Sequence, residues 1–188
     1  MVDIFLTYFN KSSQITIFVL AWLSIYFILT FAILISRLIA LKLWKNKEQA
    51  ALNSLTQEIN LSDFNSVFSR YISGGVSQAR IDICLSSCET KATSGLTWLS
   101  LIASTSPFIG LFGTVVAILE TFSTMGEGNN SLSIIAPAIS EALIATGCGI
   151  FVAIPAYSFH LILRRKAAEL LAVLKRESIV LLASYRTE

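Results

Sequence analysis

Residues 106–115 read SPFIGLFGTV and residues 136–147 read APAISEALIATG, two apolar stretches that carry glycine, serine or threonine along their length. Each stretch lies in a segment long enough to cross a bilayer. A helix that faces only lipid needs bulky apolar side chains, whereas small residues and hydroxyls suit close packing on other helices or a narrow polar path. The two stretches therefore indicate a membrane conduit rather than an enzyme.

The composition of the chain is that of a membrane protein. Hydrophobic residues make up 54% of the 188 residues, charged residues make up 14%, and the mean hydropathy is +0.70, far from the values of soluble proteins. A helix of about 20 residues crosses the ~30 Å hydrocarbon core. Three runs without Asp, Glu, Lys or Arg exceed that length, namely residues 12–36, 92–119 and 142–163.

We therefore predict an all-α integral membrane protein that forms a single membrane domain over residues 1–188. Its transmembrane helices are expected at about 13–36, 96–119 and 138–163. The first is expected to be retained rather than cleaved as a signal peptide. Its apolar core is longer than the usual roughly 7–15 residues, and basic residues follow it.

Basic residues gather after the first and third runs, whereas only Lys11 directly precedes the first. Those that follow the runs are Arg37, Lys42, Lys45, Lys47, Arg164, Arg165 and Lys166. The segment between the second and third runs, residues 120–141, contains three Glu and no Lys or Arg. By the positive-inside rule, the N-terminus and a loop at 120–137 are expected outside, and residues 37–91 and 164–188 in the cytoplasm.

The cytoplasmic segments have an amphipathic pattern. Apolar residues recur there at three- and four-residue intervals, which predicts helices with one apolar face. These residues are Leu38, Leu41, Trp44, Leu52, Leu55 and Ile59, and in the tail Leu170, Leu171, Leu174, Ile179 and Leu182. We expect long helices that extend the transmembrane helices into a cytoplasmic bundle, with turns at 73–75 and 127–130.

Small residues form a stripe on each of the two later spans. The members are Gly110, Gly113 and Ala117 in the second span, and Ala142, Ala145, Gly149 and Ala153 in the third. Such stripes let a neighbouring backbone approach closely, so these helices are expected in the interior and the bulkier first span at the periphery. Pro107 and Pro155 each free a backbone carbonyl. Each proline either kinks its helix or only shapes the bundle.

Two threonines are expected at one depth in the membrane. Thr114 precedes Glu120 by six residues, and Thr146 follows Glu141 by five. At ~1.5 Å per residue both lie roughly 7–9 Å inside their acidic flanks, and the two helices run antiparallel. Two interpretations remain open: the hydroxyls form a polar belt in a symmetric oligomer, or each bonds to the carbonyl four residues earlier in its own helix.

Other kinds of chemistry find little support. Cys84 and Cys88 lie four residues apart without neighbouring His or further Cys, so we interpret them as packing residues rather than a metal site. An intramembrane hydrolase would need a serine within reach of His160, yet Ser158 faces elsewhere on the same helix and no nucleophile motif precedes the histidine. No phosphate-binding loop occurs, and neither a cofactor nor nucleic acid is expected as a ligand.

The quoted stretches resemble the TolQ/ExbB/MotA family, the multi-span subunits of proton-driven motors. The resemblance covers residues 102–155, where SPFIGLFGTV is followed by IAPAISEALIAT and then by AIPA. TolQ and ExbB have three spans with the N-terminus outside, whereas MotA has four. The wording of the two signatures is slightly closer to TolQ.

The resemblance implies a homopentamer in the bacterial inner membrane that encloses a dimer of a single-span TolR/ExbD-like partner, with a TolA- or TonB-like protein as a further partner. In the family, the partner contributes a membrane aspartate that takes up protons. By motif, Thr114 and Thr146 would line the path facing that aspartate, with Ser106 as a further lining residue and Glu141 near the outer mouth. Because the uncharged runs hold no acidic or basic carrier, the partner would have to supply one.

The chain departs from the family at a few positions, and two other functions remain open. Val116 and Ala117 stand where the family usually has Trp-Gly, and Ala138 stands where it often has Gly. A non-conducting membrane scaffold explains the small-residue stripes but leaves the matched depth of the threonines as a coincidence. A MotA-like stator subunit would need a fourth span.

Overall fold

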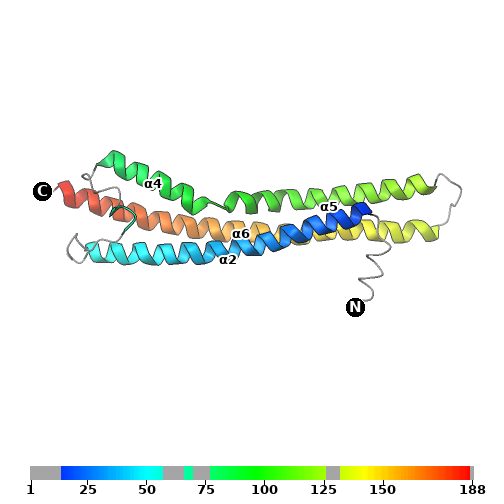
Figure 1. Cartoon of the computed structure of the whole chain (residues 1–188), viewed down its shortest axis with the longest axis horizontal. Coiled ribbons are helices and arrows are strands. Elements are labelled where there is room, and N and C mark those ends of the chain that lie inside the picture. Colours follow the sequence, from blue (N-terminus) through cyan, green and yellow to red (C-terminus); the bar gives the residue numbers. More distant parts are fainter. Residues whose placement is uncertain (1–13, 57–65, 70–76, 126–131, 187–188) are drawn as a thin grey trace. The chain divides into compact units, whose positions relative to one another are not determined.

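A computed structural model describes residues 14–56, 66–69, 77–125 and 132–186 of the chain. Its helices, labelled in Figure 1, are α2 (Gln14–Thr56), α4 (Gln78–Thr93), α5 (Leu96–Met125) and α6 (Leu132–Arg186). These residues contain no strand, so the prediction of an all-α protein is confirmed. Three helical stretches are long and apolar enough to cross a membrane, as predicted. The pentamer stays a prediction.

The helices are longer than the predicted spans. With 43 and 55 residues, α2 and α6 measure about 65 and 80 Å along their axes, at least twice the hydrocarbon thickness. Helix α5 also continues to Met125, and α6 begins at Leu132, so most of the predicted loop at 120–137 is helical. The predicted turns at 73–75 and 127–130 lie outside the described residues.

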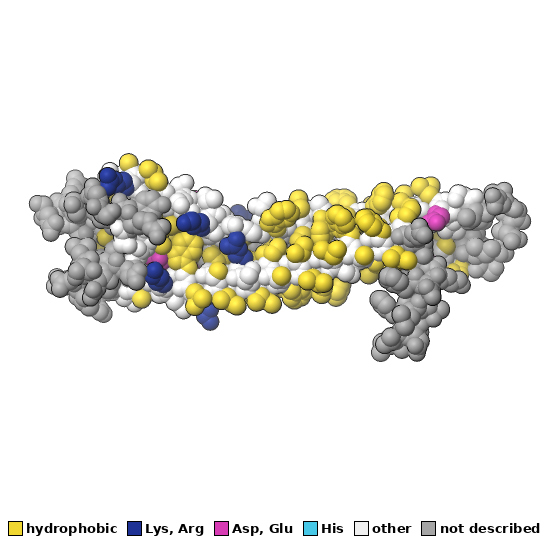
Figure 2. Space-filling view, in the orientation of Figure 1, with side chains coloured by type: hydrophobic (Ala, Val, Ile, Leu, Met, Phe, Trp, Pro, Cys, Tyr) yellow, Lys and Arg dark blue, Asp and Glu magenta, His cyan; other side chains and the backbone are white. Residues whose placement is uncertain are grey.

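Two compact units make up the fold, and unit 1 is the more apolar. It comprises the described residues up to Ala32 together with those of Trp98–His160. Its small core is formed by Val19, Leu23, Ile102, Ala145, Val152 and Ala156. Large apolar side chains cover its outside, and Phe108 is 70% exposed. Figure 2 shows these side chains in yellow over the visible face of unit 1, a surface suited to lipid or to other apolar helices.

Unit 2 comprises the described residues of Ile33–Thr97 and those from Leu161 onward. The predicted apolar stripes supply part of its core, since Leu41, Leu170 and Leu174 are buried. Ile179 is 66% exposed, so its assignment to the stripe was wrong. Nine residues at about 100° each place Ile179 on the side of α6 opposite Leu170.

The thiols of unit 2 lie on the buried face of α4. Cys84 and Cys88 are free cysteines and almost fully buried. Burial, and then the neighbouring Cys88, raise the pKa of the Cys84 thiol to about 12. A thiol that stays protonated and inaccessible behaves as a small apolar side chain, which agrees with a role in packing.

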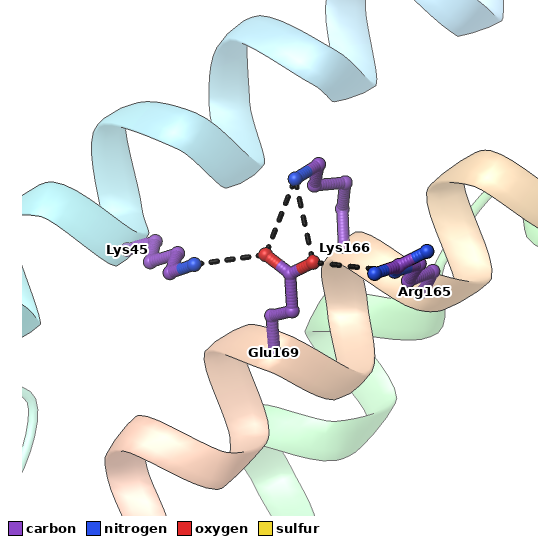
Figure 3. Close-up of polar contacts among 4 residues, drawn as sticks. All are labelled: Lys45, Arg165, Lys166 and Glu169. Carbon is purple, nitrogen blue, oxygen red and sulfur yellow. Dashed lines mark hydrogen bonds and ion pairs between the residues drawn. The ribbon is translucent and has the colours of Figure 1, made fainter.

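An ion-pair cluster joins α2 to α6 within unit 2 (Figure 3). The carboxylate of Glu169 accepts a hydrogen bond of 2.8 Å from Nζ of Lys45 and one of 3.2 Å from Nζ of Lys166. Nε of Arg165 lies 3.6 Å from the same carboxylate. The Lys45 bond, followed by the Lys166 bond, lowers the pKa of Glu169. This carboxylate is therefore held in its ionised form on the rim of the bundle.

A glycine joint separates α4 from α5. Gly95 has φ = +86°, a left-handed conformation that costs other residues free energy. A Cβ atom on Gly95 would also lie 3.0 Å from Nε of Arg37. The Arg37 guanidinium donates a 2.7 Å hydrogen bond to the hydroxyl of Ser94 at the same joint, which ties the end of α4 to α2.

We expect Gly95→Ala to lower the free energy of unfolding by about 1–2 kcal/mol, because an alanine Cβ atom is too close to the backbone in the left-handed conformation at this φ. Thermal unfolding in detergent, followed by circular dichroism, measures the loss. Gly147→Ala is the control, since a Cβ atom there meets nothing within 4 Å. Equal transition temperatures for the two variants would contradict the strain.

Candidate functional site

Within unit 1, α5 and α6 touch through their backbones at two glycines. A Cβ atom placed on Gly149 would lie 2.6 Å from the carbonyl oxygen of Ser106 and 3.1 Å from Cα of Gly110. A Cβ atom on Gly110 would lie 2.7 Å from the carbonyl oxygen of Ala145. Real Cβ atoms do not approach backbone atoms this closely, so the contact requires glycine on both helices. We call this the glycine contact.

Helix α2 packs beside the glycine contact. A Cβ atom on Gly113 would lie 3.1 Å from Cγ1 of Val19 and 3.2 Å from Cβ of Ala145. Three helices thus meet at one point, with Val19 filling the space that the glycine leaves. This role of Val19 could not be predicted, because bulky apolar residues surround the first span on nearly all sides.

The hydroxyls of Thr114 and Thr146 lie one turn from the glycine contact and hydrogen-bond to each other across α5 and α6. We call these residues the threonine pair. The Thr114 hydroxyl is also 3.1 Å from the carbonyl oxygen of Ala142 and 3.2 Å from that of Gly110. The Thr146 hydroxyl is 3.3 Å from the carbonyl oxygen of Gly110. Thr114 therefore reaches the carbonyl four residues earlier in its own helix and groups of the facing helix at once.

The threonine pair forms a small polar centre in an apolar unit. Two hydroxyl hydrogens are shared among four oxygens: the two hydroxyls and the carbonyls of Gly110 and Ala142. Such hydroxyls can donate and accept hydrogen bonds, but they do not titrate at physiological pH. Both side chains are only half-buried. The pair can thus orient water or a carboxyl group placed against it, but it cannot hold a proton as a charged carrier.

The other predicted site residues lie around the pair. Ser106 is fully buried and its hydroxyl donates a 2.6 Å hydrogen bond to the carbonyl oxygen of Ile102, so it does not join the pair. Glu141 is half-buried and directly precedes Ala142. The remaining predicted packing residues differ in burial. Buried are Ala142 and Ala145, and half-buried are Ala117, Ala153, Pro107 and Pro155.

The hydroxyls that a hydrolase would use are engaged within their own helices. Ser158 donates to the carbonyl oxygen of Ile154 at 2.9 Å, and Ser104 to that of Leu101 at 3.0 Å. Among the described residues, no three His, Cys, Asp or Glu side chains gather into a group that could hold a metal ion. The chemistry of unit 1 is therefore that of close-packed helices with a hydroxyl pair between them.

Comparison with known proteins gives one family. Residues 45–176 match the MotA/TolQ/ExbB proton channel family. That stretch contains the glycine contact and the threonine pair, and it includes most of unit 2. The match therefore extends well beyond the two signature helices.

One of the relatives matches this chain over nearly its full length, and two others match less than half of it. A Helicobacter pylori protein named as an ExbB-like biopolymer transport protein is 40% identical over 174 residues, which cover 90% of this chain and 92% of the relative. The Tol-Pal system protein TolQ of Pseudomonas aeruginosa is 43% identical over 83 residues, 44% of this chain and 36% of the relative. The biopolymer transport protein ExbB of Neisseria gonorrhoeae is 47% identical over 72 residues, 38% of this chain and 33% of the relative.

Proposed function

This chain belongs to the MotA/TolQ/ExbB proton channel family, and we propose that it is the multi-span subunit of an inner-membrane proton channel that drives work on the cell envelope. In this proposal, protons move along the contact between α5 and α6 past the threonine pair. The hydrogen bond between the Thr114 and Thr146 hydroxyls carries the proposal. With the carbonyl oxygens of Gly110 and Ala142 it forms a polar centre between α5 and α6 that a membrane carboxylate of a partner could meet.

A partner subunit is part of the proposal because the path lacks a carrier. The uncharged runs contain no Asp, Glu, Lys or Arg, and threonine does not titrate in the physiological range. ExbB and TolQ proteins work with partners of the ExbD and TolR type. We propose that five copies of this chain surround a dimer of such a single-span partner, whose aspartate binds the proton. Desolvation in the path would raise the pKa of that aspartate toward working pH.

The orientation is proposed from the basic flanks. Lys and Arg residues lie over unit 2 (Figure 2), and the positive-inside rule assigns such a unit to the cytoplasm. The N-terminus and the link between α5 and α6 would then face the periplasm. Force would pass to a TolA- or TonB-like protein. The signature wording favours TolQ, whereas a relative aligned over 92% of its length bears an ExbB-like name, so the branch stays a prediction.

We expect proton flux into liposomes only when this chain is reconstituted with its single-span partner from the same cells. The chain alone should match empty liposomes, because it offers hydroxyls and no carrier. A pH-sensitive dye inside the liposomes, with an imposed potential, measures the flux. Replacing the membrane aspartate of the partner with asparagine is the matched control and should abolish the flux.

Two results would argue against this function. Equal flux with and without the partner would show that the chain conducts by itself. A native mass spectrum of the chain extracted with lipid that shows a monomer or dimer and no single-span companion would favour the non-conducting scaffold.

A further inference from the structure

Two glutamates lie in the core of unit 2. The side chains of Glu48 on α2 and Glu177 on α6 are both fully buried, with 0% of their surface exposed. Glutamate is almost never buried to this extent unless it is paired. By contrast, Glu169 lies eight residues before Glu177 on the same helix and is partly exposed in its cluster of basic residues. The burial of Glu48 and Glu177 therefore requires a separate explanation.

Both glutamates occupy core positions of the apolar stripes. On α2, Glu48 follows the buried Leu41 by seven residues and precedes the buried Ala51 by three. On α6, Glu177 follows the buried Leu174 by three residues and precedes the buried Leu181 by four. These intervals keep a side chain on one face of a helix. Continuation of the helices thus forces both carboxyl groups inward.

The surroundings of the two carboxyl groups differ. Glu48 accepts hydrogen bonds from Nε1 of Trp44 at 3.1 Å, from the Ser66 hydroxyl at 2.8 Å and from the backbone N–H of Val67 at 3.4 Å. These donors satisfy the hydrogen-bonding needs of the buried Glu48 carboxyl group. Neither oxygen of Glu177 has a hydrogen-bond partner in the described part of the chain. One carboxyl group is therefore satisfied and the other is not.

Among the described residues, the groups that shift the pKa of Glu177 do not include a cation. The charge of Glu48 on α2 raises the pKa of Glu177, and the hydroxyl of Ser66 lowers it. The Cys84 and Cys88 thiols on α4 interact electrostatically with both glutamates. Two of the described lysines of unit 2, Lys45 and Lys166, hold Glu169 instead.

Burying an unpaired carboxylate is far costlier than burying a neutral carboxylic acid. A second carboxylate beside it adds repulsion, so one of two adjacent buried groups keeps its proton. Burial raises the pKa of Glu177 from 4.5 to about 8, the Ser66 hydroxyl opposes this rise in part, and the neighbouring Glu48 makes a smaller contribution that raises the pKa further. At neutral pH Glu177 therefore keeps its proton, which removes the negative charge that the surrounding side chains do not compensate.

We propose that Glu48 and Glu177 form a carboxyl pair that binds one proton inside unit 2, apart from the threonine pair and independent of proton conduction. Glu177 carries the proton, and Glu48 keeps its three donors. The ligand of this site is the proton itself. The site makes the packing of α2 against α6 in unit 2 depend on pH.

The sign of this dependence follows from linkage. Between about pH 4.5 and 8 the folded chain holds a proton on Glu177 that the unfolded chain has released, so stability falls as the pH rises through this window. Above the folded pKa neither state holds the proton, and the contribution becomes constant. Glu169 has the opposite sign, because its lowered pKa adds stability that is lost as the pH falls through its folded pKa.

The test is an infrared pH titration of the full chain in lipid nanodiscs, with its partner where the two copurify. We expect the C=O stretching band of a protonated carboxyl to vanish with a midpoint near 8. Glu177→Gln should remove this band and flatten the fall of the unfolding temperature between about pH 4.5 and 8. Glu169→Gln, the control on the same helix, should leave both in place.

A second variant distinguishes the pair from a lone buried acid. Glu48→Gln removes the neighbouring charge but not the burial, so the midpoint should fall below that of the wild type and stay above 4.5, the ordinary value for glutamate. An unchanged midpoint would overturn the pairing. A neutral-pH spectrum in which Glu177→Gln removes no protonated carboxyl would overturn the site. An unfolding temperature that rises with sodium or magnesium concentration, and does so only when Glu177 is present, would replace the proton with a metal cation.

Discussion

Replacing Gly149 with alanine is expected to push α5 away from α6 and to cost about 3 kcal/mol of unfolding free energy, the upper part of the usual range for overpacking. The new methyl group would lie 2.6 Å from the carbonyl oxygen of Ser106. A carbonyl oxygen within a helix cannot rotate out of the way as a side chain can. The helices must therefore separate, which also pulls Thr146 from Thr114 and should reduce proton flux.

Gly147→Ala is the matched control for Gly149→Ala. It lies two residues earlier on the same helix, and a Cβ atom there meets nothing within 4 Å. Alanine is favoured over glycine in a helix by up to about 1 kcal/mol, so this variant should unfold at the same temperature as the wild type or higher. Gly110→Ala, on the other side of the glycine contact, should reproduce the loss. Equal stability of the 147 and 149 variants would show that the two helices are not held at this distance.

Removing either hydroxyl of the threonine pair should lower proton flux about tenfold, as expected when a polar group in a desolvated site loses a partner worth ~1–2 kcal/mol. Thr114→Val and Thr146→Val keep the shape of the side chain and remove only the hydroxyl. Because the two hydroxyls bond to each other, the double variant should lose little more than either single one. Additive losses would mean that the hydroxyls act separately.

Two further variants show whether the hydroxyl itself matters for flux. Thr114→Ser keeps the hydroxyl and should retain most of the activity. Ser106→Ala removes a hydroxyl that bonds only within its own helix, so it should leave the flux nearly unchanged. Native mass spectra of all variants establish that the assembly is intact. Unchanged flux in the double valine variant would remove the threonine pair from the route.

Periodicity and helix geometry account for much of unit 1. The spacing of small residues singled out Gly110 and Gly149, and the rise per residue placed Thr114 level with Thr146. The position of α2 could not be obtained in the same way. Its bulky residues lie on nearly all sides, so no period distinguishes the face that carries Val19 from the faces turned outward.

Unit 2 was less predictable because its core contains residues that are expected on the surface. A stripe on α6 through Leu170, Leu174 and Ile179 passes over Glu177, because glutamate is rarely buried. A strict count of three or four residues from Leu174 leads to Glu177 and Ser178 instead, and both are buried. The helical period therefore predicts burial at position 177, but a glutamate at that position argues against it.

The glycine contact also limits which substitutions this sequence can accept during evolution. The three atoms that a methyl group would meet first at Gly110 or at Gly149 all belong to the backbone, which every amino acid shares. No second substitution in the facing helix could relieve the clash, so these positions should show no compensating partner. Gly113 meets the side chains of Val19 and Ala145 instead. A larger residue there could be accommodated by a smaller one at 19, and covariation between these two positions is expected.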